Sequence, residues 1–121
     1  MYTEEQNKEI KKVMEVFSEY IKHVPYFDVL WSDKVGYIFL DGISRNKDEI
    51  GVAPLVLRDG EALCNEIFYN LACDILEERG KLHDLCQCNK EEQEAVKEKL
   101  SIYLQQLPEY AYLVEKLFEK K

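Results

Sequence analysis

The chain has 121 residues, the length of one domain, and 46% of them are hydrophobic, as in ordinary folded proteins. Its formal net charge of −8 repels phosphate backbones, so direct binding of DNA or RNA is not expected. No apolar run approaches the ~20 residues that span a bilayer, and the first residues lack the pattern of a signal peptide. These features predict a single cytoplasmic domain over residues 1–121, with reduced thiols and no membrane contact.

An amphipathic helix is predicted at the N-terminus. Thr3 and Gln6 have the spacing of a capping box, in which each side chain bonds the backbone amide of the other residue. Apolar residues then recur at steps of three and four as far as Val24. Pro25 ends the helix, which is expected to reach about His23.

The period of the sequence then changes to that of β-strands. Alternating apolar residues, a polar turn at residues 32–34 and the β-branched and aromatic run 35–40 predict a hairpin. Residues 50–57 predict a third antiparallel strand. Because Pro54 lacks an amide donor, this strand should lie at a sheet edge or carry a bulge.

Three helices are predicted after the sheet. The pair 59–60 caps a long helix, about 61–79, which is apolar around most of its girth and should therefore lie centrally, packed on the sheet. Asn89 and Glu92 form a second capping box, and Pro108 separates the last two helices. The predicted fold class is α+β: an N-terminal helix, a three-stranded antiparallel meander, then three helices with the long central one on the sheet.

All four cysteines fall between residues 64 and 88. Thiolates with an imidazole are a ligand set for zinc. The set of ligands predicted for such a site is Cys73, His83, Cys86 and Cys88. The one-residue separation of Cys86 and Cys88 suits a loop but matches no familiar zinc module. Plain burial of the thiols in the core explains the same residues more simply, and a redox-responsive thiol pair is the other alternative.

Tyrosines gather around Pro108 near the C-terminus. Tyr103, Tyr110 and Tyr112 lie close to this junction, and tyrosine is enriched at protein interfaces. These three residues predict self-association or binding of a protein partner through the C-terminal helices. Packing of the same residues into the core is the alternative.

The sequence favours binding over catalysis. It contains no phosphate-binding loop and no identifiable nucleophile with a base and an orienting residue. The leading hypothesis is therefore a non-enzymatic interaction or regulatory module without a cofactor. The alternatives are the zinc or redox module, an acidic mimic of nucleic acid, and a small-molecule site between the sheet and the long helix. That last site would be lined by Trp31, Tyr37, Phe39 and Tyr69.

Overall fold

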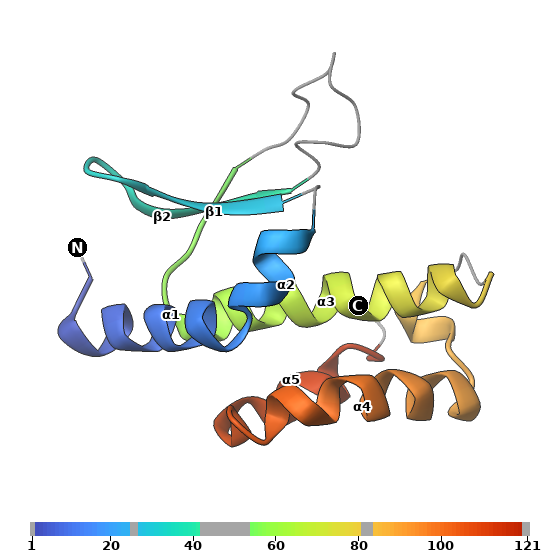
Figure 1. The fold of residues 1–121 in the computed structure, drawn as a ribbon. Helices are drawn as coiled ribbons and strands as arrows, with labels where there is room; N and C mark the ends of the chain where they lie inside the picture. Colours follow the sequence, from blue (N-terminus) through green and yellow to red (C-terminus); the bar gives the residue numbers. More distant parts are fainter. Residues whose placement is uncertain (1, 25–26, 42–53, 81–83, 120–121) are drawn as a thin grey trace, which may run out of the picture. The chain divides into compact units, whose positions relative to one another are not determined.

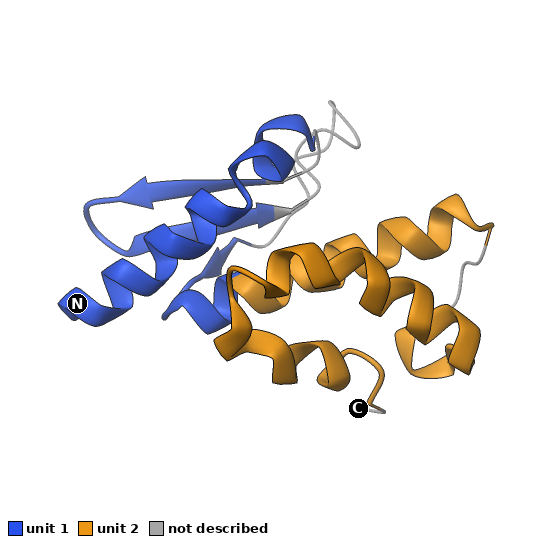
Figure 2. Cartoon of the chain, turned by 60° about the horizontal axis from the view of Figure 1, so that its bottom comes forward, with its two compact units in different colours: residues 1–63 blue, residues 64–121 orange. Residues whose placement is uncertain are grey.

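The computed structural model describes residues 2–24, 27–41, 54–80 and 84–119 (Figure 1). The described chain has the predicted α+β class, with helix α1 first, then a three-stranded antiparallel sheet, then further helices. It forms two compact units, residues 1–63 and 64–121, which we call unit 1 and unit 2 (Figure 2). The long helix α3, Gly60–Glu78, begins in unit 1 and continues into unit 2.

The first predicted helix is present, but it is divided in two. Helix α1 spans Glu4–Val16 and α2 spans Ser18–His23. Phe17, between them, has φ −98° and ψ 15° and is fully buried. Because no glycine or proline marks this position, the sequence pattern could not show the break. Val24, before the proline, is extended, with ψ 118°.

The sheet of unit 1 has the order β1-β2-β3 and is antiparallel throughout. Strand β1 spans Phe27–Ser32, β2 spans Gly36–Asp41 and β3 spans Leu55–Val56. The third strand is shorter than predicted, and residues 50–53 of the prediction lie outside the described residues. Within the described sheet β3 is an edge strand, as Pro54 led us to expect.

One face of the sheet belongs to the core of unit 1. Successive strand residues point to opposite faces, so Tyr37 and Phe39 share a face with Leu57, which follows β3 and donates its amide to the Tyr37 carbonyl at 2.9 Å. All three side chains are buried. Helix α1 lies along one side of the sheet (Figures 1 and 2). Its residues Ile10 and Val13 are fully buried.

Unit 2 is helical in its described residues. After α3 come the 3-10 turn η1 (Leu85–Gln87), helix α4 (Lys90–Leu104), the 3-10 turn η2 (Pro108–Tyr110) and helix α5 (Ala111–Lys116). The ammonium of Lys97 on α4 lies 3.0 Å from the carboxylate of Glu115 on α5. The fully buried side chains Ile67, Val96 and Leu107 come from three segments of this unit, so the unit has its own apolar core.

Candidate functional site

The structure places three of the four predicted zinc ligands in one region of unit 2. Cys73 lies on α3, Cys86 in the middle of η1 and Cys88 at the end of that turn. The charges of Cys73 and Cys86 both act on the thiol of Cys88, so both lie within electrostatic range of it. The fourth predicted ligand, His83, lies outside the described residues.

The surroundings of Cys88 disfavour its thiolate. Cys88 is buried, Cys73 is half-buried and Cys86 is exposed. Burial, followed by the charges of Glu92 and the two other thiols, raises the pKa of Cys88. Tyr69 lies one helical turn before Cys73 on α3. The pKa of Tyr69 is raised, first by the charge of Cys73, then by burial and by a hydrogen bond to Cys73. At neutral pH Cys88 is therefore an uncharged thiol, the form that reacts and binds metals poorly.

A pocket of about 440 Å³ opens beside the thiols in unit 2. Its lining consists of Tyr69, Asp84, Leu85, Cys86, Gln87, Leu117 and Glu119. In the described part of the chain, no group of three or more His, Cys, Asp or Glu side chains is arranged to hold a metal ion. The zinc site therefore stays a prediction that includes His83.

The three predicted interface tyrosines differ in exposure. Tyr110 is buried in unit 2, Tyr103 is half-buried and Tyr112 is 42% exposed. The ammonium of Lys116 lies 5.3 Å from the centre of the Tyr112 ring, within the range of a cation–π contact. Of the three, Tyr112 is the one most accessible to a partner, and their common interface stays a prediction.

The aromatic residues of unit 1 pack against one another. The ring centres of Trp31 and Tyr37 are 4.8 Å apart, and the ring of Tyr2 lies 5.5 Å from that of Tyr37. Tyr37 and Phe39 are buried, whereas Trp31 is 53% exposed. Of the residues predicted to line a ligand site, Tyr37 and Phe39 thus belong to the core, and Trp31 and Tyr69 reach solvent.

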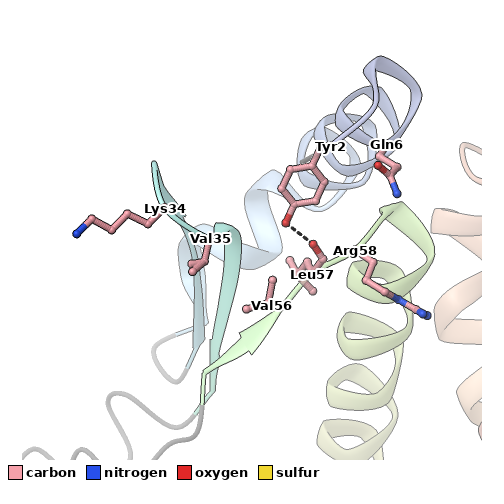
Figure 3. A pocket seen from close by; sticks show the side chains of 7 residues that line it. All are labelled: Tyr2, Gln6, Lys34, Val35, Val56, Leu57 and Arg58. Carbon is pink, nitrogen blue, oxygen red and sulfur yellow. Dashed lines mark hydrogen bonds between the residues drawn. The ribbon is translucent and has the colours of Figure 1, made fainter.

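The hydroxyl of Tyr2 completes the pairing of β2 with β3. It accepts the amide proton of Tyr37 at 3.0 Å and donates its own proton to the carbonyl of Leu57 (Figure 3). In a regular antiparallel pair the Tyr37 amide would bond that carbonyl directly. Tyr2 therefore ties the start of the chain to the sheet end where β3 stops. No signal in the sequence indicated this contact, because it joins residues far apart in the chain.

A pocket of about 370 Å³ lies beside Tyr2 in unit 1. It is lined by Tyr2, Gln6, Lys34, Val35, Val56, Leu57 and Arg58. Val35 and Val56 are both 49% exposed and supply apolar surface. The side chain of Lys34 extends away from the other lining residues, so its charge does not point into the pocket (Figure 3). The pocket is thus mainly an apolar hollow at the edge of the sheet.

The second face of the sheet is an exposed aliphatic surface, which we call the outer sheet face. Leu30 pairs with Ile38, and Ile38 pairs with Val56, so these side chains form one row across all three strands. Leu30 is 43% exposed and Val56 is 49% exposed, while Ile38 is half-buried. Leu40, also half-buried, shares this face, and its cross-strand partner is Asp28. The buried residues Tyr37 and Phe39 occupy the opposite face.

The outer sheet face was not predicted, although the sequence carries a signal for it. The run 37–40 on β2 is apolar at every position, which is typical of a strand that is covered on both faces. A strand with one solvated face alternates apolar with polar residues instead. The unbroken run therefore indicates that the outer sheet face is suited to burial.

One outward amide of β1, an edge strand of the described sheet, is already bonded by a side chain. The backbone groups of Tyr37 point toward β3, because Tyr37 bonds Leu57. Those of the next residue, Ile38, therefore point toward β1 and its partner Leu30. The backbone amide of Val29, next to Leu30 on β1, consequently points away from the sheet. The Val29 amide donates to the carboxylate of Asp28 at 2.8 Å. Carboxylates at an edge strand hinder addition of a further strand.

No helix in the described ranges combines the length and apolar character needed to cross a membrane. Comparison of the chain with known protein families, with curated proteins and with solved structures finds no match.

Proposed function

We propose that this protein is a non-enzymatic interaction module that binds protein through the outer sheet face. The observation that carries the proposal is the aliphatic row of Leu30, Ile38 and Val56 across all three strands, in which Leu30 and Val56 are exposed and Ile38 is half-buried. Removing such aliphatic surface from water is favourable by about 25 cal/mol per Å². Burial of the row therefore stabilises a complex with any protein that covers it.

The chemistry of the outer sheet face supports binding rather than reaction. Its centre consists of aliphatic side chains, which bury well but supply neither nucleophile nor proton donor. Polar groups lie at its margins, with Asp28 at one end and Ser32 at the other. An apolar centre with a polar rim is the usual anatomy of a protein interface.

Carbene footprinting at low protein concentration tests whether the outer sheet face is open. Leu30 and Val56 are expected to be labelled strongly by the photogenerated carbene because they are exposed, and the half-buried Ile38 more weakly. Ile102, 58% exposed on α4, is the positive control, and the fully buried Ile10 is the negative control. If the row were protected like Ile10 in the monomer, other parts of the same chain would cover it and the proposal would fail.

The thiols of unit 2 support a second candidate, a metal-binding or redox-responsive module. The specific observation is that Cys73 and Cys86 both lie within electrostatic range of Cys88. Native mass spectrometry of protein purified without chelator tests the metal. One bound zinc that is lost on Cys86→Ser and kept on Cys64→Ser would support the candidate, because Cys64 is fully buried. A mass without metal, together with thiols that peroxide does not oxidise, would remove it.

A further inference from the structure

We infer that the occupant of the outer sheet face is the outer sheet face of a second copy of this chain, in a weak two-fold dimer. This inference rests on the proposed function and names its partner. The two sheets stack face to face with their strands running in opposite directions. Each row of Leu30, Ile38 and Val56 then packs on the same row of the other copy.

The arrangement of the row suits a two-fold contact. In such a contact the same patch serves both copies. Because the strands of the two copies run in opposite directions, the axis runs along the row, so residues on the row meet themselves and the two ends of the strands exchange places. Leu30, Ile38 and Val56 all lie along this axis, so each is placed against the same residue of the other copy. Aliphatic side chains at these positions interdigitate when two sheets pack at about 10 Å.

Charges at the two ends of the patch complement each other in this arrangement. Asp28 lies two residues beyond the row in one direction along β1, and Lys34 lies in the turn beyond the other end. Both side chains are exposed. When the ends exchange places, Asp28 of each copy faces Lys34 of the other, so two contacts of opposite sign form together. A parallel stacking would instead place Asp28 of each copy over the β3 side of the other sheet, so it would not form these two contacts.

The size of the face sets the strength of the pair. The face is roughly 14 Å wide, because it has three strands about 4.8 Å apart. It is roughly 17 Å long, because it covers about five residues of 3.3 Å each along the strands. A stable interface buries about 800 Å² on each partner, well above what such a face offers. The dimer is therefore expected to be in rapid, concentration-dependent equilibrium with the monomer.

Sedimentation equilibrium on the full chain, from about 10 µM to about 1 mM, tests the dimer. The weight-average mass is expected to rise from 14.3 kDa toward twice that value. Ile38→Lys puts two like charges at the dry centre of the pair, so association should weaken at least about tenfold. Ile102→Lys, the same change at an exposed position of α4, is the matched control and should associate like the parent chain.

A charge exchange between two variants tests the antiparallel stacking. Asp28→Lys and Lys34→Asp chains should each associate about fivefold or more weakly than the parent, because each pair of identical chains then has two repulsive contacts. An equimolar mixture of the two variants should recover the parental association, since both contacts of the mixed pair are again of opposite sign. Mixing without recovery would overturn the stacking of two copies proposed here.

Footprinting across the same concentrations separates this inference from the proposed function. Protection of Leu30, Ile38 and Val56 that grows with the mass supports the dimer. A chain that stays at 14.3 kDa up to about 1 mM and stays labelled at the row overturns the dimer, yet leaves the face open to a different protein. Protection of the row at every concentration overturns both proposals.

Discussion

Gly36 and Tyr2 are the most closely fitted pair of residues in the sheet region. Gly36 begins β2 with φ +95°, a left-handed conformation that residues with a Cβ rarely adopt. A Cβ at this position would also collide with the ring of Tyr2. Gly80, which follows α3, has φ +71° as well, but a Cβ there would meet nothing within 4 Å. The two glycines thus share a backbone requirement and differ in their surroundings.

These two glycines give a matched pair of substitutions. Gly80→Ala should lower the free energy of unfolding by about 1 kcal/mol, the cost of a left-handed backbone. Gly36→Ala should cost at least about 1 kcal/mol more, because the displaced Tyr2 hydroxyl also loses its bonds to Tyr37 and Leu57. Urea unfolding of both variants measures the difference. Equal losses would mean that the Tyr2 ring moves aside without cost.

The buried thiol of Cys88 predicts a loss of stability at alkaline pH. Its pKa is raised in the folded chain, so the unfolded chain loses this proton first, above about pH 8.5. The contribution of Cys88 to stability is therefore complete below that pH and is lost as the pH rises through the folded pKa. The free energy of unfolding, measured with urea between about pH 7 and pH 10, should fall as the pH rises. In Cys88→Ala this free energy should decrease less steeply with pH.

A matched variant separates this titration from general alkaline unfolding. Cys86→Ala removes the exposed thiol of the same turn and should leave the pH dependence of the free energy of unfolding unchanged. An identical pH profile in Cys88→Ala and in the parent chain would show that another group, such as Tyr69, dominates the alkaline loss. The pKa of Tyr69 is also raised, so its own effect should begin only above about pH 10.

At the scale of elements, the helix starts are the best predicted features. The Asn89 side chain accepts the amide proton of Glu92 at 2.8 Å, and the Glu92 carboxylate accepts that of Asn89 at 2.9 Å. The same reciprocal bonds join Thr3 and Gln6 at the start of α1. Both capping boxes were visible in the sequence, because their partners lie only three residues apart.

The cap of α4 should contribute measurably to stability. Asn89→Ala removes the acceptor for the Glu92 amide and should lower the free energy of unfolding by about 1 kcal/mol. Ser101→Ala, at an exposed position within the same helix, is the control and should be neutral or slightly stabilising. Thermal unfolding followed by circular dichroism compares the two. A loss of equal size in both variants would assign the effect to general helix propensity.

Element boundaries were predicted less well wherever distant residues decide them. The break at Phe17 lies within a regular apolar stripe, and nothing local in the sequence interrupts the helix there. Strand β3 was predicted from its β-branched and apolar residues, but its pairing with β2 covers only Leu55 and Val56. Strand length depends on the partner strand and on the Tyr2 hydroxyl that closes the ladder, and neither is local.

At the scale of the whole molecule, α3 connects the two units without a linker. It starts at Gly60 in unit 1 and runs to Glu78 in unit 2, so the boundary near residue 63 falls inside a continuous helix. Unfolding one unit would leave α3 without part of its packing, and most of the stability of a helix in a protein comes from such packing. We therefore expect a single cooperative transition, consistent with the predicted single domain.

Scanning calorimetry of the parent chain tests this cooperativity. The calorimetric and van't Hoff enthalpies of unfolding should agree, as they do for two-state domains. Scans at two heating rates should give the same midpoint, which checks that unfolding is at equilibrium. Two resolved transitions, or a calorimetric enthalpy well above the van't Hoff enthalpy, would show that the two units unfold as separate domains.

The sequence by itself determined the fold class, the helix caps and the chain order of helices and strands, because these depend on period, turn chemistry and residues a few positions apart. It also singled out Cys73, Cys86 and Cys88, which the structure brings within electrostatic range in unit 2. Which side chains stay exposed depends on contacts between distant segments, so it became visible only in the folded chain. The row of Leu30, Ile38 and Val56 exists because strand register aligns three distant segments, and register is set by pairing across the sheet.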